Sequence, residues 1–218
     1  MPEQTELLEK YNRRLVEKNK VFNLTAHKTF EDSWTANICD SLLFCEYFRN
    51  ITKSNIKVLD LGSGGGCPAV PLKIMCTNIN MIMIDGTRKK VNFLNEIVTE
   101  LGLEGISAIH TRIEGYAATN RDVFDIITAR AVAALPTLLE YALPMLKVDG
   151  VLLAYKGKNW QTEIVDSNRA LEVLGGKVIE TLVDNLEGKE RVLIVVRKIH
   201  ITDKKYPRGG NLALLKPL

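Results

Sequence analysis

The sequence predicts an α/β fold, in which a Rossmann-like and mostly parallel sheet ends in an antiparallel hairpin and follows a group of N-terminal helices. From residue 57 onward, short apolar runs alternate with amphipathic helical segments, as in a parallel sheet covered by helices. A glycine-rich loop, residues 62–66, comes directly after the first apolar run. The last two runs are joined by a segment with no room for a crossover helix, so they must pair antiparallel.

Length and composition support one substantial domain with smaller additions. A chain of 218 residues with 46% hydrophobic and 25% charged residues is typical of a globular protein, which excludes the disordered and fibrous classes. We expect an N-terminal helical cap over residues 1–50, a Rossmann-like domain over residues 51–200 and a basic C-terminal tail over residues 201–218.

Two amphipathic helices are expected before the glycine loop, over residues 3–20 and 30–48. Each has one apolar stripe at helical spacing. The first stripe contains Leu7, Leu8, Tyr11, Leu15 and Val16, and the second contains Trp34, Ile38, Leu42, Cys45 and Phe48. Because both helices precede the loop, they can cover the ligand side of the sheet.

The sheet and its helices follow from the alternation of short runs and longer periodic segments. Parallel strands are expected at residues 57–61, 80–85, 106–111, 124–129 and 150–155, and helices at residues 68–76, 87–101, 134–146 and 161–174. The helix from residue 87 carries a regular apolar face, and Gly102 supplies its C-terminal stop. The C-terminal hairpin pairs residues 177–182 with residues 191–197.

The glycine loop favours one nucleotide-type ligand over another. A dinucleotide-binding loop has the pattern G-x-G-x-x-G, but the third glycine position counted from Gly62 is Cys67. The pattern present is D-x-G-x-G-x-G, from Asp60 to Gly66. Asp60 at the strand end would repel a pyrophosphate, whereas it suits a ligand that carries an ammonium and a sulfonium group. This pattern therefore favours S-adenosylmethionine.

Two further features bear on this ligand. Asp85 ends the second apolar run, where a carboxylate that binds ribose belongs, although Asp85 alone does not separate the two cofactors. The antiparallel hairpin at the end of the sheet is typical of class I S-adenosylmethionine-dependent methyltransferases, whereas a dehydrogenase sheet stays parallel. Together they favour methyl transfer.

Other features limit the location and the partners. The N-terminus lacks the regions of a signal peptide, and no apolar run has the length of a membrane span. The four cysteines form no C-x-x-C pair and the three histidines are scattered. We expect a cytoplasmic monomer that binds neither metal nor membrane. The net charge is only +3, but basic residues cluster at Arg13, Arg14, Lys18 and Lys20, at Arg88, Lys89 and Lys90, and at Lys204, Lys205 and Arg208.

Several motifs spread over nearly the whole chain resemble one family. They are Asn23-Leu24-Thr25, Asp40-Ser41, residues 62–71, residues 85–94, Arg130-Ala131, Lys156-Gly157, Glu190-Arg191 and Lys205-Tyr206-Pro207-Arg208. In combination they resemble the ribosomal small-subunit RNA methyltransferase G family, also called glucose-inhibited division protein B. The resemblance implies an enzyme that uses S-adenosylmethionine to methylate N7 of a guanine in 16S ribosomal RNA.

The resemblance also implies where the cofactor binds. The expected cofactor-binding residues are Gly62, Ser63, Gly64, Gly66, Cys67, Asp85, Ile113, Glu114 and Arg130. These positions lie at the carboxyl ends of the expected parallel strands, where such sheets bind ligands. Three positions depart from the family pattern: Gly65 stands where proline is usual, Cys67 where leucine or phenylalanine is usual, and Asn37 where histidine is usual.

The expected reaction needs no acid or base, because the N7 lone pair of guanine carries no proton. The enzyme must supply proximity, alignment and desolvation, so we assign no catalytic acid or base. The candidates for RNA binding are Arg88, Lys89, Lys156 and Arg208. Two alternatives remain open: a methyltransferase of the same fold that acts on a protein or small molecule, and a non-catalytic nucleotide-binding module.

Overall fold

The computed structural model describes residues 2–49 and 55–218. The boundary expected between the helical cap and the sheet domain, at residues 50 and 51, lies outside the described residues. We call the helical segment of residues 2–49 the N-terminal cap.

Seven strands form one sheet in the order β3-β2-β1-β4-β5-β7-β6. The strands are β1 (Ile56–Leu61), β2 (Ile79–Asp85), β3 (Ile106–His110), β4 (Phe124–Arg130), β5 (Leu146–Lys156), β6 (Gly176–Leu186) and β7 (Lys189–Lys198). The first five run parallel, and β7 lies antiparallel between β5 and β6. The predicted sheet, parallel with a C-terminal antiparallel hairpin, is confirmed.

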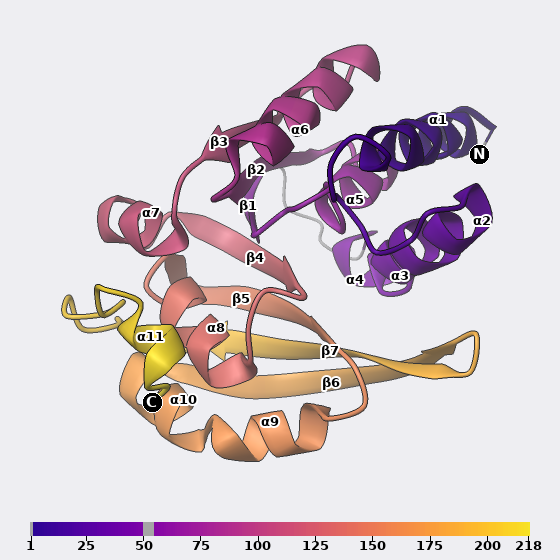
Figure 1. Cartoon of the computed structure of the whole chain (residues 1–218). Coiled ribbons are helices and arrows are strands. Elements are labelled where there is room, and N and C mark those ends of the chain that lie inside the picture. Colours follow the sequence, from indigo (N-terminus) through magenta and orange to yellow (C-terminus); the bar gives the residue numbers. More distant parts are fainter. Residues whose placement is uncertain (1, 50–54) are drawn as a thin grey trace.

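Helices cover both faces of the sheet (Figure 1). The N-terminal cap contains α1 (Pro2–Asn19), α2 (Phe30–Ser33), the π-helix η1 (Trp34–Cys39), α3 (Asp40–Leu42) and α4 (Cys45–Arg49). The later helices are α5 (Ala69–Met75), α6 (Arg88–Glu100), α7 (Ile113–Thr119), α8 (Leu135–Ala142), α9 (Trp160–Asp166), α10 (Asn168–Leu174) and α11 (Leu212–Leu215).

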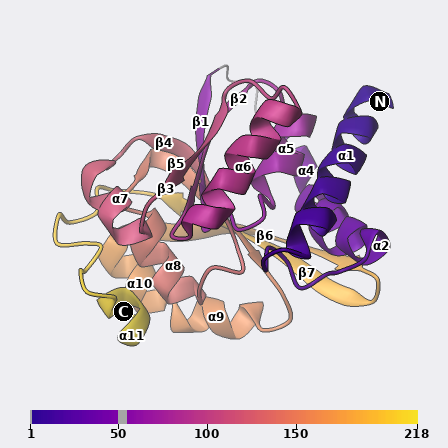
Figure 2. The ribbon, with the colours of Figure 1, turned by 45° about the horizontal axis from the view of Figure 1, so that its top comes forward.

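The alternation of side chains along each strand divides the core into two layers. The N-terminal cap packs with α5 and α6 on one face, through residues such as Tyr11, Phe48 and Phe93. Residues of α7, α8, α10 and α11 form the core on the other face. Figure 2 shows α1 beside α5 and α6, and ion pairs from Arg14 to Glu100 and from Lys18 to Glu96 join α1 to α6. The cap is therefore part of the same folded unit as the sheet.

Several predicted boundaries were wrong, for local reasons. The predicted helix over residues 30–48 is interrupted by η1, and the one over residues 161–174 breaks at Ser167. Ser167 donates its side-chain hydrogen bond to the carbonyl of Glu163 (2.6 Å). Helix α8 ends at Ala142 rather than residue 146, because Leu146 already pairs with Phe124 as the first residue of β5.

The hairpin and the short helices also differ from the prediction. The hairpin strands are several residues longer than predicted, because their tip is polar and exposed and carries no hydrophobic signal. Helices α7 and α11, of seven and four residues, were not predicted. The tail is held against the sheet domain, since the Arg121 guanidinium donates to the carbonyl oxygens of Thr202 and Tyr206, both at 2.6 Å. No helix in the described ranges is both long and apolar enough to cross a membrane.

Candidate active site

A cavity of about 1030 Å³ opens at the carboxyl edge of the sheet. It lies over the ends of β1, β4 and β5, next to the point where the strand order reverses between β1 and β4. Open α/β sheets bind their ligands at this point. The N-terminal cap and the hairpin tip form its outer wall, where Thr35 donates a hydrogen bond to Glu187 (3.2 Å). Six predicted site residues line it: Gly62, Ser63, Gly64, Cys67, Arg130 and Lys156.

The glycine loop is held in place by Asp85. One carboxylate oxygen of Asp85 accepts from the backbone N–H of Gly64 (2.9 Å), and the other accepts from that of Thr87 (2.8 Å). The Ser63 N–H donates to the carbonyl of Ile84 (3.0 Å). Asp85 is buried and does not line the cavity itself, but it fixes the loop that does.

Helix α1 packs against the glycine loop from the other side. The buried Tyr11 hydroxyl donates to the carbonyl of Gly65 (2.7 Å) and lies 3.2 Å from the sulfur of Cys67. Gly66 has a φ of +104°, and a Cβ there would lie 2.9 Å from the Tyr11 oxygen and from Leu94. Only glycine fits this position without a shift of its neighbours. Burial raises the pKa of the Cys67 thiol, which favours its neutral form. The contact of Cys67 with a cofactor stays a prediction.

Asp60 is a buried acid with one unpartnered oxygen. Its Oδ1 accepts a hydrogen bond from the Thr128 hydroxyl (2.6 Å), whereas its Oδ2 has no partner among the described residues. Burial raises the pKa of Asp60 to about 6. Burial disfavours the ionised form of this carboxylate, and a cation bound beside it would stabilise that form. This agrees with the interpretation of Asp60 as a partner for a positively charged ligand.

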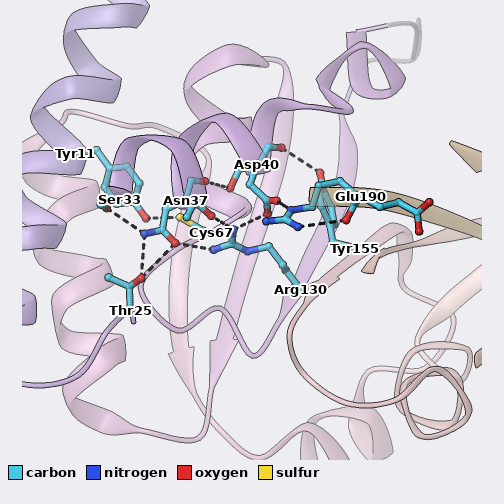
Figure 3. Close-up of polar contacts among 12 residues, drawn as sticks. Tyr11, Thr25, Ser33, Asn37, Asp40, Cys67, Arg130, Tyr155 and Glu190 are labelled. Carbon is cyan, nitrogen blue, oxygen red and sulfur yellow. Dashed lines mark hydrogen bonds and ion pairs between the residues drawn. The ribbon is translucent and has the colours of Figure 1, made fainter. Parts of the chain in front are cut away.

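Arg130 joins the end of β4 to the N-terminal cap (Figure 3). Its guanidinium donates to the carbonyl of Ala36 (2.8 Å), to Asp40 (2.8 Å) and to the side-chain oxygen of Asn37 (3.0 Å). The second carboxylate oxygen of Asp40 forms an ion pair with Arg191 on β7. One buried aspartate therefore holds together the cap, β4 and the hairpin. The pairing of Asp40 with Arg130 was not predicted, although a buried arginine at a strand end needs a carboxylate partner.

Asn37 has a definite place in this network despite its departure from the family pattern. Its amide nitrogen donates to Ser33 and to Thr25, both at 3.0 Å, while its oxygen accepts from Arg130. Asn37 lies within the π-helix η1. Single-turn π segments are frequent at functional sites, and this one directs Ala36, Asn37 and the start of α3 toward the same arginine.

A second ion pair lies at the end of β5. The Lys156 ammonium donates to Glu163 on α9 (2.6 Å) and to the carbonyl of Ala133 (2.8 Å). The same Glu163 oxygen accepts from the backbone N–H of Leu135 (2.7 Å). Lys156 and Glu163 thereby fix the loop that follows β4, and both line the cavity.

The other predicted residues lie outside the cavity lining. Ile113 and Glu114 begin α7 after β3, where Glu114 accepts a hydrogen bond from Tyr141 (3.1 Å). Arg88 and Lys89 are exposed at the start of α6, and the adjacent Lys90 does line the cavity. The contacts of these residues with a cofactor or with RNA stay predictions.

Arg208 lies in the tail, away from the cavity lining. Its guanidinium pairs with Glu140, which is fully buried on α8 (2.6 Å for the shortest N–O distance). This pairing gives Arg208 a structural role that the sequence analysis did not foresee. Its role in RNA binding stays a prediction.

The sheet order, the loop fixed by an acid at the end of β2 and the cavity at the carboxyl edge define a class I methyltransferase fold. The chain resembles P. horikoshii TYW2 in complex with MeSAdo, with a TM-score of 0.60 and 16% identity over 74% of this chain and 62% of that chain. It also resembles M. jannaschii TYW2 in complex with AdoMet, with a TM-score of 0.57 and 18% identity over 73% of this chain and 77% of that chain. At these identities the likeness shows the fold alone.

Sequence comparison then gives the family. The family model described as GidB, rRNA small subunit methyltransferase G, matches residues 4–194. The ribosomal RNA small subunit methyltransferase G of Lactobacillus johnsonii is 40% identical over 215 residues, covering 95% of this chain and 89% of the relative. That of Leuconostoc citreum is 38% identical over 219 residues, covering 99% and 92%. The chain belongs to the rRNA small subunit methyltransferase G family.

Proposed function

We propose that this protein transfers a methyl group from S-adenosylmethionine to N7 of a guanine in small-subunit ribosomal RNA, in the cytoplasm. The observation that carries the proposal is a continuous cavity that runs from the glycine loop to the Lys156 side of the sheet. Its volume of about 1030 Å³ is at the upper end of the usual range for one small ligand. It has room for a cofactor and for a base beside it.

The residues at the glycine loop fit S-adenosylmethionine. The unpartnered oxygen of Asp60 supplies a negative charge under the loop for the cationic part of the cofactor. Asp85 lies at the end of the next strand, where a carboxylate that binds ribose belongs in such sheets, although here it is buried behind the glycine loop. Ile113 and Glu114 follow the end of β3. When bound, the cofactor supplies an electrophilic methyl group on a sulfonium.

The charged residues of the cavity suit positioning better than proton transfer. Arg130 is paired with Asp40, and Lys156 is paired with Glu163. The guanine N7 attacks with a free lone pair, so no residue has to remove a proton. The protein contributes alignment of the base and exclusion of water.

The direct test uses tritiated S-adenosylmethionine and small ribosomal subunits that lack their normal N7 methylation, followed by chemical strand cleavage at 7-methylguanine. We expect label in the RNA and one cleavable site. Label in a protein or small molecule instead would support a methyltransferase with another substrate. Binding of NADH without binding of S-adenosylhomocysteine would support a non-catalytic nucleotide-binding module.

The start of α6 is proposed as part of the RNA surface. Changing Arg88, Lys89 and Lys90 to glutamate should weaken RNA binding at least about tenfold. It should also reduce the steepness of the plot of log K against log salt concentration by about 3, since each lost phosphate contact reduces the slope by about 1. Affinity for S-adenosylhomocysteine should stay within about twofold, because Arg88 and Lys89 lie outside the cavity lining and Lys90, which lines it, does not hold the glycine loop. Fluorescence anisotropy with rRNA at several salt concentrations measures both quantities.

The matched control reverses to glutamate three exposed basic residues that lie on other elements than α6: Arg169 on α10, Lys177 on β6 and Arg197 on β7. Lys177 pairs with Arg197 across β6 and β7, and Arg197 pairs with Val151, far along β5 from Lys156. The change in net charge is identical, so a purely global charge effect would weaken RNA binding equally in both variants. That result would remove α6 from the RNA surface.

Asp60 gives a second prediction, on pH dependence. Its pKa of about 6 in the folded chain lies above the ordinary 3.8. The folded state therefore binds the extra proton between these values, and the free energy of unfolding of the ligand-free protein should fall as the pH rises through this interval, by up to about 3 kcal/mol. The Asp60→Asn variant should lose this fall. Urea unfolding from about pH 4 to about pH 7 measures it.

The same carboxylate should make cofactor binding pH-dependent. Because the ionised form of Asp60 attracts a cationic ligand, affinity for S-adenosylmethionine, which carries an ammonium and a sulfonium group, should rise as the pH passes through about 6 in the wild type and stay flat in Asp60→Asn. Isothermal titration calorimetry compares the two proteins. Equal pH profiles would show that Asp60 does not interact with the charge of the ligand.

A further inference from the structure

We propose that Lys156, held by Glu163, donates a hydrogen bond to O6 of the target purine and thereby selects guanine over adenine. The inference rests on the proposed function and adds the residue that determines the base. It is carried by the position of Lys156 in the cavity, by the one N–H of its ammonium that has no partner in residues 2–49 and 55–218, and by the chemistry of the purine edge beside N7.

The position of Lys156 separates it from the cofactor half of the site. Apart from Arg130 at the end of β4, the residues proposed for the cofactor follow β1, β2 and β3, on one side of the strand reversal. Lys156 ends β5 on the other side, next to Tyr155, which pairs with Arg130 at the end of β4. The cavity extends over this side and is bounded there by the N-terminal cap and the hairpin. A base beside the cofactor would therefore lie over the β4 and β5 ends.

The ammonium of Lys156 is fixed, but not fully used. An ammonium has three N–H donors. Two donate to the carbonyl of Ala133 (2.8 Å) and to Glu163 (2.6 Å), and the third has no partner among the described residues. The Lys156 side chain is only 9% exposed and lines the cavity, so the third donor is available to a ligand there. Glu163 is itself fixed by the N–H of Leu135 (2.7 Å).

The purine edge explains what such a donor would select. Guanine and adenine both carry N7 with a free lone pair, so the reacting atom alone does not distinguish them. Next to N7, guanine presents the acceptor O6, whereas adenine presents the N6 amino group, which is a donor. A fixed ammonium N–H stabilises O6 and repels the amino group. One free donor can bond O6 and leave the N7 lone pair for the reaction, whereas a guanidinium that bonds both atoms would occupy it.

The pairing with Glu163 fits the charge change of the reaction. As the bond from N7 to the methyl carbon forms and the bond from sulfur to that carbon breaks, the positive charge passes from the sulfonium to the purine, and no proton moves. An isolated ammonium beside the purine would oppose this charge. The carboxylate of Glu163 makes the pair neutral overall while leaving the N–H donor in place.

The test compares wild type and Lys156→Met on small subunits whose ligated rRNA carries guanine, adenine or 2-aminopurine at the mapped target position. The last two keep N7 and lack O6. We expect wild-type kcat/KM to fall about 100-fold on 2-aminopurine and at least as much on adenine. On guanine, the kcat/KM of Lys156→Met should be about 100-fold lower than that of the wild type. The kcat/KM of this variant should be almost the same on 2-aminopurine as on guanine. Its affinity for S-adenosylhomocysteine should match that of the wild type.

Two controls separate the alternatives. Glu163→Gln keeps an oxygen for Leu135 and Lys156 and should still discriminate guanine from 2-aminopurine. The double variant Lys156→Met with Glu163→Gln leaves no unpaired carboxylate and replaces Lys156→Met if that protein fails to fold. An unchanged ratio of guanine to 2-aminopurine in a folded Lys156 variant would overturn the inference while the proposed function stands. Absence of RNA label with the wild type would overturn both.

Discussion

Replacing Asp40 with alanine is expected to lower the free energy of unfolding by about 3 to 5 kcal/mol. Asp40 is buried, and its two oxygens pair with Arg130 and Arg191, whose side chains are only 19% and 27% exposed. Removing the carboxylate leaves two arginine charges near one another without their shared counterion. Arg130 keeps only the carbonyl of Ala36 and the oxygen of Asn37.

Urea unfolding of Asp40→Ala, Arg191→Ala and the double variant measures this effect and its origin. If the loss arises from an unpaired Arg191, the double variant should recover at least about 1 kcal/mol relative to the sum of the single variants. Asp32→Ala, at an exposed aspartate on α2 that forms no ion pair among the described residues, is the control and should change stability by less than about 0.5 kcal/mol. A cost below about 1 kcal/mol for Asp40→Ala would show that the network does not hold the cap.

The parts of the fold that the sequence predicted are those set by local patterns. The strands of the parallel sheet appear as short apolar runs, and the glycine loop appears as a fixed spacing after the first of them. The hairpin followed from the length of one linker. Each of these signals lies within a few dozen residues, which is the range over which periodicity and turn composition act.

The parts that the sequence analysis missed depend on contacts between distant residues. Tyr11 reaches Cys67 across 56 positions, and Asp40 reaches Arg191 across 151. The π-helix η1 has the same apolar spacing as an ordinary helix, so no local pattern predicts it. Arg130 was predicted as a cofactor residue through resemblance and its place at a strand end, and that contact stays a prediction. Its guanidinium holds the N-terminal cap.

This dual position of Arg130 has a consequence for ligand binding. The residue lines the cavity and is bonded to the cap, so the cap cannot move without changing the cavity wall. Asp40→Ala should therefore also weaken S-adenosylhomocysteine binding, although Asp40 is not among the residues proposed to contact the cofactor. The effect should be smaller than that of a change at the glycine loop itself.

Replacing Asp85 with alanine should produce that larger effect, an approximately 100-fold loss of affinity for S-adenosylhomocysteine, since hydrogen bonds to a charged group contribute about 1.5 to 3 kcal/mol. Two causes act together. The N–H groups of Gly64 and Thr87 lose their common acceptor, which frees the loop, and the cofactor ribose loses its proposed carboxylate. Asp85→Asn keeps one acceptor oxygen and should lose about tenfold. Asp166→Ala, at an exposed aspartate on α9, should change affinity by less than about twofold.

A ligand without ribose hydroxyls separates the two causes. If Asp85 bonds the ribose, the dideoxyribose analogue of S-adenosylhomocysteine should bind the wild type much more weakly than the parent does, and Asp85→Ala should bind the two ligands about equally. If Asp85 only orders the loop, the Asp85→Ala substitution should weaken the binding of both ligands by the same factor. The second outcome would keep Asp85 as the residue that fixes Gly64 and would remove it from the cofactor contacts. The effects of removing the carboxylate and of removing the ribose hydroxyls are non-additive only if the two groups interact.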